Sequence, residues 1–568
     1  MRRAFVWARR LGFTALAALC AALAGAPAQA EPVRGGTAIL AVDADPQTLD
    51  PAVSTDYVAG DIGAKIFEGL VWLDAAALPQ PQLATTWTIS DDGKSYTFKL
   101  RDNVLWHDGK PFTSADVKFT FEEVLAKFHP RSSAMMKRLG LVVETPDDKT
   151  VLLKLNAPYA PFLTQLSVFD APIIPKHLFA GTDILKNPAA QKPVGTGPFR
   201  FTSWERGASV TLDRFDGYWQ KGKPYLDRIV FQVIPQPASR LSSLQTGEVD
   251  FVSDFYLSKA DIPALLKTDT FQARIGKALP AIYFAELNLR KAPFDKVAAR
   301  HAMAFAIDRN RLVQQAMNGL ARPGYGAFGD GFGWTLNPDS SYPKLYPYDP
   351  EKAKALLAEA GIAAGAKMRI AYEAARPQMV ATAQIVRENL KQIGLDAVVE
   401  PLERTVLLQK VFKEHDFDIA LMSYFSSGDP AIGYNRLYIA NPTDAINANA
   451  AGYADPKVDE LLTKAATVTD LSARGAIYKA VQTILSEDMP AVVLYDEAGV
   501  DLGSKKLHGL WKSVDTRALW EEVWLQPRGR AAHPGAATLP VALIRGGGPA
   551  LPFVGAGGTP AVPAVALP

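Results

Sequence analysis

WTISDDGKSYTFKLRDNVLWHDGKPFTSADVKFTFEEVLAKF, residues 87–128, is the most informative stretch of this 568-residue chain. Apolar and polar residues alternate over 95–100, which is the pattern of a strand with one buried face. The Asp-Gly pairs at 92–93 and 108–109 supply the positive φ that tight turns need. The stretch therefore predicts a hairpin followed by a second tight turn.

A helix is expected at the end of this stretch. Thr113 stands three residues before Asp116, which is the spacing of a capping box. Apolar residues then recur at helical spacing and predict one buried face: Val117, Phe121, Val124, Leu125 and Phe128.

The amino-acid sequence of this stretch resembles the signature region of the family 5 solute-binding proteins, the extracytoplasmic receptors of peptide, nickel and related ABC importers. Three later blocks resemble further parts of that family: PVGTGPF at 193–199, followed by Trp204; NLRKAPFDKVAARHAMAFAID at 288–308; and GYADPKVDELL at 452–462. Their order and spacing extend the resemblance from about Gly35 to Gln526.

The resemblance implies an α/β, two-lobe periplasmic binding protein fold, with a hinged cleft and an extra α+β subdomain on the first lobe. We expect a signal peptide at 1–30, a first lobe at 31–283 with the subdomain at about 74–190, and a second lobe at 284–495. Residues 496–526 would return to the first lobe. Residues 527–568, rich in Gly, Ala and Pro and without acid, would form a disordered tail.

Periodicity supports an α/β second lobe. The order strand (Met368–Tyr372), helix (Gln378–Ile393), strand (Asp396–Pro401) predicts a βαβ unit with parallel strands. A further apolar strand is expected at Phe417–Ser423, and Ala491–Tyr495 is expected to be the strand that returns to the first lobe. Two crossings between lobes would leave a cleft that closes around a ligand by hinge motion.

Charge gives no indication of a nucleic-acid or anionic-membrane partner. The first 30 residues hold four Arg and the tail holds three, with no acid in either segment. In residues 31–526, 54 basic residues therefore face 59 acidic ones, a formal charge of −5.

The N-terminus has the form of a secretory signal. A basic segment (1–10) precedes an apolar, Ala-rich one (11–25) and the small-residue site Ala28-Gln29-Ala30. We expect cleavage after Ala30 and a periplasmic product, with Sec and twin-arginine export as alternatives. The single cysteine, Cys20, lies in this signal, so no thiol-based site is expected.

The loop that follows the 417–423 strand is the expected ligand contact. In the family the equivalent loop closes on the ligand, and peptide-binding members carry there an aspartate that pairs with the α-ammonium. That position falls here on Ser426, and Asp429 either contacts ligand or caps a turn. The predicted contacts on this loop are Tyr424, Phe425, Ser426, Ser427 and Asp429.

Three residues elsewhere are weaker predicted contacts. Tyr57 follows the first strand on a loop that reaches the cleft in the family, and Trp334 lies in a Gly-rich loop. Arg376 lies near, but not at, the position of the arginine that meets a dipeptide carboxylate. A ligand with a blocked or absent α-ammonium therefore fits at least as well as a free dipeptide.

The predicted function is the receptor of an ABC importer, a monomer that binds a peptide or peptide-like solute and delivers it to a membrane permease and ATPase. The alternatives are a receptor for a metal chelate, haem, an opine or a sugar-like solute, and a secreted hydrolase. No Gly-x-Ser-x-Gly or His-Glu-x-x-His motif supports a hydrolase. No cofactor is expected, and His107, His129 and His177 lack partners at metal-ligand spacing.

Overall fold

The computed structural model describes residues 31–253, 256–257, 260–275, 281–374, 376–426, 428–514 and 517–526. The predicted signal peptide and tail lie outside these residues. None of the helices in the described part of the chain is both long and apolar enough to cross a lipid bilayer.

The first large sheet has seven strands in the order β12-β19-β11-β1-β10-β9-β8. β1 pairs in parallel with β10 and β11, whereas β19 is antiparallel to β11 and β12. The strands are β1 (Thr37–Val42), β8 (Phe199–Glu205), β9 (Ser209–Arg214), β10 (Arg228–Val233), β11 (Phe251–Val252), β12 (Phe271–Ile275) and β19 (Val500–Ser504).

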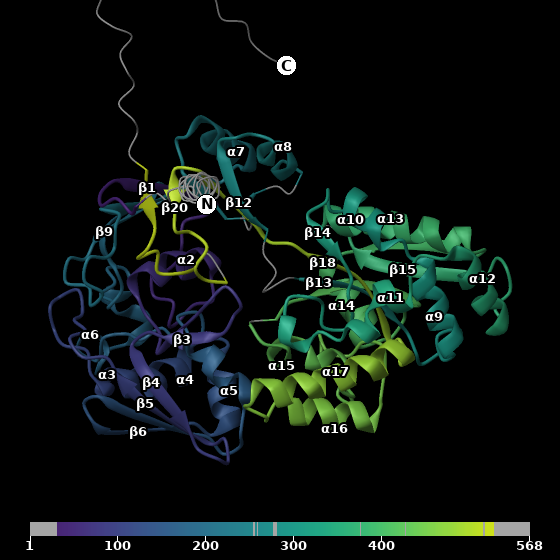
Figure 1. Ribbon diagram of the computed structural model, residues 1–568, viewed down its shortest axis with the longest axis horizontal. Helices are drawn as coiled ribbons and strands as arrows, with labels where there is room; N and C mark the ends of the chain where they lie inside the picture. Colours follow the sequence, from purple (N-terminus) through teal and green to yellow (C-terminus); the bar gives the residue numbers. More distant parts are fainter. Residues whose placement is uncertain are drawn as a thin grey trace, which may run out of the picture. The chain divides into compact units, whose positions relative to one another are not determined.

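A four-stranded antiparallel sheet in the order β4-β5-β7-β6 forms the extra subdomain, with α3, α4 and α5 beside it (Figure 1). It contains the hairpin expected from residues 87–128. The strands are β4 (Ala84–Ile89), β5 (Ser95–Leu100), β6 (Val142–Asp147) and β7 (Thr150–Lys154).

The predicted helix after this hairpin is confirmed, with one difference. Thr113 and Asp116 form the expected capping box before α3 (Ser114–Phe119). The middle of the helix, Thr120–Leu125, has π-helical hydrogen bonding before α4 (Ala126–Phe128). The predicted apolar face is buried except at Phe128, which is half-buried.

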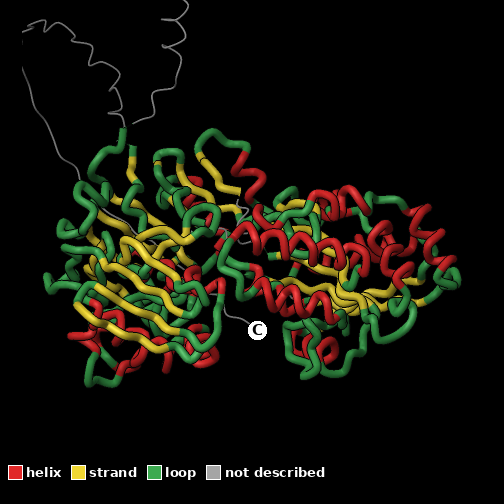
Figure 2. Tube along the Cα trace, turned by 60° about the horizontal axis from the view of Figure 1, so that its bottom comes forward, coloured by secondary structure: helices red, strands yellow, loops and turns green. Residues whose placement is uncertain are grey.

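The second large sheet has six strands in the order β14-β18-β13-β17-β15-β16. Its strands are β13 (Ile282–Leu287), β14 (Ala321–Pro323), β15 (Lys367–Glu373), β16 (Asp396–Leu402), β17 (Ile419–Tyr424) and β18 (Ala491–Glu497). The predicted βαβ unit is confirmed, because α13 (Pro377–Gln392) joins the parallel strands β15 and β16. Figure 2 shows the helices packed along these strands.

One strand assignment was wrong. Ala491–Tyr495 does not return to the first sheet: it lies within β18, which pairs with β13 and β14 of the second sheet. The returning strand is β19, and only Ala498 and Gly499 separate it from β18. Apolar composition could not distinguish two successive buried strands that belong to different sheets.

Two hydrophobic cores explain the two-lobe fold. One contains the second sheet and its helices; the other contains both the first sheet and the subdomain. The two-lobe α/β prediction is therefore confirmed, while the exact residue bounds of the lobes stay predictions.

Shorter elements complete the described chain. Two-stranded ribbons pair β2 (Val71–Leu73) with β3 (Pro79–Pro81) and β20 (Leu507–His508) with β21 (Trp524–Leu525). The remaining α-helices are α2 (Tyr57–Ile66), α5 (Ser132–Leu139), α6 (Lys176–Phe179), α7 (Pro237–Thr246), α8 (Ile262–Leu266), α9 (Val297–Ala306), α10 (Arg309–Gln315), α11 (Tyr342–Leu345), α12 (Pro350–Glu359), α14 (Arg404–Phe412), α15 (Pro430–Gly433), α16 (Pro456–Ala465) and α17 (Leu471–Asp488). The 3₁₀ turns are η2 (Ala160–Leu166), η3 (Ile184–Lys186), η4 (Pro188–Ala190), η6 (Gly333–Thr335), η7 (Pro338–Ser340) and η8 (Asn435–Leu437).

Candidate functional site

The loop after β17 begins from a buried anchor. Tyr424, the last residue of β17, is 2% exposed, and its ring packs edge-on against Phe284 with centroids 5.5 Å apart. Glu286 lies near the Tyr424 hydroxyl, and burial raises the pKa of the Glu286 carboxyl to about 8. Tyr424 thus supports the loop from the second core, and ligand contact through it stays a prediction.

Asp429 caps α15 and forms a buried ion pair with Arg474. One carboxylate oxygen accepts from the Ala431 amide at 2.8 Å and from Arg474 Nη2 at 2.6 Å, and the other accepts from Arg474 Nη1. Both charged side chains are less than one-tenth exposed. The turn-capping alternative is therefore directly visible, and the ligand-contact alternative for Asp429 stays a prediction.

Ser426 and Trp334 gather around the same pair. Ser426 is buried and its hydroxyl donates to the Asp429 backbone carbonyl. The Arg474 guanidinium lies 5.2 Å from the Trp334 ring centroid, and that ring packs against Tyr478. Arg474 was missed by the sequence reasoning, since an arginine near the start of an amphipathic helix gives no signal of its buried partner.

Phe425 differs from its neighbours, because its side chain is 60% exposed. The loop backbone folds tightly against α15: a Cβ on Gly433 would lie 2.1 Å from the Phe425 carbonyl oxygen. Phe425 therefore presents an aromatic surface from a closely packed turn. Ser427 lies outside the described residues.

Arg376 stands at the same edge of the second sheet. β15 and β17 run in parallel, so their carboxyl ends share an edge, where open α/β sheets place ligands. Arg376 pairs with Glu373 at 3.0 Å and donates to the Ser423 hydroxyl at 3.2 Å. It thereby links the ends of both strands beside the predicted loop.

Tyr57 belongs to a separate aromatic group in the first lobe. Its hydroxyl lies 3.3 Å from Ser253 Oγ, and its ring packs edge-on against Tyr256. The Arg517 guanidinium lies 4.8 Å from the Tyr57 ring centroid and 4.7 Å from that of Phe169. Arg517 thus joins α2 to the loop that contains Phe169.

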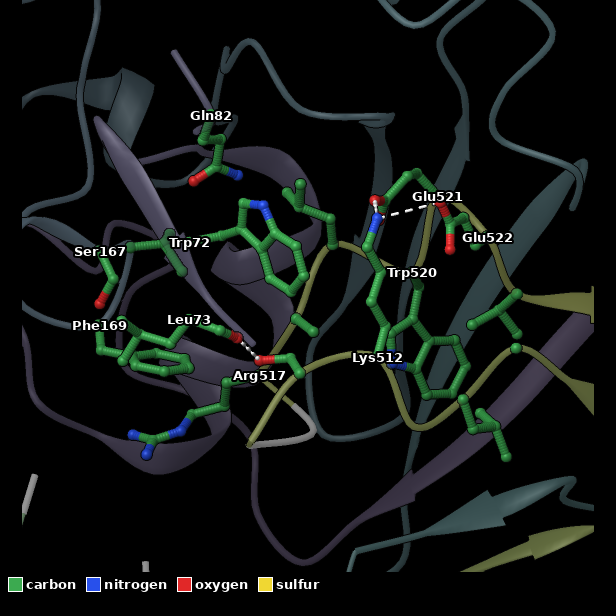
Figure 3. A pocket seen from close by; sticks show the side chains of 17 residues that line it. Trp72, Leu73, Gln82, Ser167, Phe169, Lys512, Arg517, Trp520, Glu521 and Glu522 are labelled. Atoms are coloured by element: carbon green, nitrogen blue, oxygen red, sulfur yellow. Dashed lines mark hydrogen bonds and ion pairs between the residues drawn. The ribbon is translucent and has the colours of Figure 1, made fainter. Parts of the chain in front are cut away.

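Figure 3 shows a pocket in this part of the first lobe. Arg517 and Phe169 lie together on one side of it, and Trp520 lies on the other side. Ser513 donates to the Leu73 carbonyl at 2.7 Å, and Lys512 pairs with Glu521 and Glu522. Much of the lining is apolar, and the volume of this pocket is about 40 Å³, far below the roughly 300–1,000 Å³ of small-molecule sites, so it forms a wall and not a complete site.

The loop of the second lobe approaches this wall at Gly428. A Cβ on Gly428 would lie 2.9 Å from Thr164 Cγ2 and 3.6 Å from Leu73 Cδ1, and Leu73 also lines the pocket of Figure 3. Gly428 therefore brings the loop after β17 next to Leu73 of this wall, and we take this approach as the candidate site.

No group of three His, Cys, Asp or Glu side chains suited to a metal ion occurs among the described residues. His177 has one carboxylate partner that is distant in sequence, since its Nε2 lies 2.6 Å from Asp108 Oδ2. Because the two residues are 69 apart in sequence, no local motif indicates that they pair.

Two α/β lobes joined by two crossings are the fold of the periplasmic binding proteins. A family model described as bacterial extracellular solute-binding proteins, family 5, middle region, matches residues 79–444. The chain belongs to this family, whose members are non-enzymatic receptors that serve as the substrate-binding components of ABC transporters.

Known proteins are similar in sequence to most of this chain. The glutathione-binding protein GsiB of Escherichia coli strain K12 is 28% identical over 534 residues, covering 91% of this chain and 99% of that protein. The periplasmic binding protein DppA of Helicobacter pylori, solved with the peptide STSA, is 28% identical with a TM-score of 0.65, covering 87% and 98%. AgaA of A. tumefacien R10, solved with agropinic acid, is 27% identical with a TM-score of 0.65, covering 87% and 99%.

Proposed function

We propose that this protein is a periplasmic receptor that captures a peptide or peptide-like solute by lobe closure and delivers it to an ABC permease and ATPase. Its export would use a signal peptide cleaved after Ala30, and the mature protein would act as a monomer. The names of its relatives support this substrate class, because GsiB binds glutathione and DppA was solved with a peptide.

A finer proposal concerns the α-ammonium of the ligand, and it rests on the ion pair between Asp429 and Arg474. A free α-ammonium needs an available carboxylate, because charged hydrogen bonds in a desolvated site contribute about 1.5–3 kcal/mol. Both oxygens of Asp429 accept hydrogen bonds from Arg474, and the expected ammonium-pairing position is the uncharged Ser426. The proposed ligand therefore has a blocked or absent α-ammonium, or is held mainly by backbone and aromatic contacts.

Native mass spectrometry of the protein purified from a periplasmic extract tests this proposal. A set of adducts that release short peptides or peptide-like compounds without a free α-amine is the expected result. Released peptides with free N-termini would contradict the proposal of a blocked or absent α-ammonium, but they would agree with a peptide as the class of substrate. A single non-peptide adduct would overturn the peptide class.

Phe425→Ala provides a second test of the same site. Phe425 is 60% exposed, so truncation removes few internal contacts and should leave the unfolding free energy nearly unchanged. Affinity for the released solute should fall about tenfold if the ring stacks on it. Val406→Ala, at a residue of similar exposure in α14, is the matched control, and equal affinities in both variants would contradict the placement of the site.

The second candidate substrate is an opine-like solute, which is favoured by the similarity to AgaA solved with agropinic acid. Such a solute has no ordinary peptide N-terminus. It would therefore not need the Asp429 carboxylate, which already accepts hydrogen bonds from Arg474. Mass spectrometry separates the two candidates, because a single carbohydrate-derived adduct differs in mass pattern from a set of peptides.

A further inference from the structure

A second cavity lies between the subdomain and the second lobe. Its volume is about 610 Å³, within the roughly 300–1,000 Å³ of small-molecule sites. Arg138 and Leu139, at the end of α5, line one side, and Leu462 and Thr463 of α16 line another. Figure 1 shows α5 beside α16. The two sides also meet directly, because the Ala160 amide donates to the Ala466 carbonyl at 2.8 Å.

The charged groups on this cavity are of one sign. Arg138 and Arg436 both line it, and none of its lining residues is acidic. Within the described part of the chain, neither guanidinium forms an ion pair with a carboxylate. The cavity is therefore lined by two solvent-exposed arginines that have no carboxylate partner among its lining residues.

Arg138 is held in place by an aromatic neighbour. The Arg138 guanidinium lies 4.7 Å from the ring centroid of Tyr159, which also lines the cavity. Partial burial lowers the pKa of Arg436, and the groups that oppose this decrease are the hydroxyls of Tyr424 and Tyr434. The contact with Tyr159 orients the Arg138 guanidinium without neutralising it.

The remaining polar lining is already internally bonded. Asn435 donates to the Leu462 carbonyl and accepts from the Tyr478 hydroxyl, and Asn441 bonds the Ala445 backbone at both its N–H and its carbonyl. A ligand would consequently depend on the two arginines for its strongest contacts. Planar guanidinium groups match carboxylate and phosphate oxygens in geometry and charge.

We propose that this cavity binds a small multivalent oxyanion, a polycarboxylate or a phosphate, between Arg138 of the subdomain and Arg436 of the second lobe. The cavity is lined in part by Ala431 and Ile432 of α15, directly after the loop that contains Phe425, but its two arginines are not among the residues predicted to bind the transport substrate. Because its two arginines come from different cores, the bound anion also ties the subdomain to the second lobe.

Calorimetric titration of the mature protein with citrate and with inorganic phosphate, at constant ionic strength, tests the proposal. We expect saturable binding of at least one probe, weakened about tenfold or more in Arg138→Gln and in Arg436→Gln. Tighter binding of citrate would assign a carboxylate ligand, and tighter binding of phosphate would assign a phosphate. Lys137→Gln is the charge-matched control, because Lys137 is exposed on the same helix and does not line the cavity.

Thr463→Glu gives an independent variant that should not affect folding, since Thr463 is exposed on α16. Its new carboxylate would compete for the arginines and should also abolish anion binding. The absence of saturable binding to the wild-type protein would overturn the proposal. Equal weakening in Lys137→Gln, or full binding by Thr463→Glu, would overturn it as well.

Discussion

Asp429 and Arg474 form a buried, two-point ion pair that joins the loop after β17 to α17 across 45 residues of sequence. The pair lies beside Trp334, and Ser426 bonds the backbone of Asp429. The loop after β17 is therefore held to its own lobe by an internal charge pair. Among the described residues of this loop, Ser426 and Asp429 are buried and Phe425 is exposed.

Asp429→Ala should destabilise the ligand-free protein. Breaking a buried pair leaves an uncompensated charge, at a cost of about 3–5 kcal/mol. Urea denaturation monitored by circular dichroism measures this change. Glu351→Ala removes an exposed partner of Lys354 and should change the unfolding free energy little. Unchanged apo stability with tenfold weaker ligand binding would instead show that Asp429 contacts ligand.

Glu286→Gln should change how stability depends on pH. Burial raises the pKa of Glu286 from 4.5 to about 8 in the folded protein, so the folded state keeps a proton that the unfolded state has lost between these values. The free energy of unfolding of the wild-type protein therefore falls as pH rises through this window, by up to about 1.4 kcal/mol per pH unit.

Because glutamine does not ionise, the Glu286→Gln variant should gain stability relative to wild type as pH rises from 4.5 to about 8. Urea denaturation at several pH values measures this difference. The control is Glu144→Gln, at an exposed carboxylate paired with Lys154. A difference that stays constant with pH would rule out titration of Glu286 in this window.

Arg376→Met should weaken binding of the solute recovered from the purified protein by about tenfold, because it removes a cation at the shared edge of β15 and β17. Arg404→Met is the matched control, since Arg404 pairs with the same Glu373 oxygen at 3.1 Å, and Arg376 pairs with it at 3.0 Å. Fluorescence titration measures both affinities. Equal affinities in the two variants would place Arg376 outside the site.

Gly428→Ala should reduce affinity through the contact between lobes. Gly428 has a φ of +88°, and an added Cβ would lie 2.9 Å from Thr164 Cγ2. Gly109→Ala is the control for backbone strain, because Gly109 has a φ of +85° and open space around it. Both variants should lose about 1–2 kcal/mol of stability, but only Gly428→Ala should bind the solute more weakly. Unimpaired binding would indicate that the approach of Gly428 to Thr164 is not required.

The hairpin, the capped helix and the βαβ unit could be predicted because their signals are local. Thr113 and Asp116 are three residues apart, and β15, α13 and β16 follow one another with clear changes of period. The strand that returns to the first sheet was misplaced, since β18 and β19 are adjacent apolar segments whose sheets are chosen by distant partners.

The sequence by itself determined the family, the two-lobe fold and the strand that precedes the predicted ligand loop, because these depend on motifs, turns and periodicity within short windows. Only the tertiary structure decided the state of the side chains on that loop. Asp429 meets Arg474, and Gly428 approaches Thr164, because the packing of whole lobes brings together residues that are far apart in sequence. The cavity between Arg138 and Arg436 arises in the same way, from helices that belong to different cores.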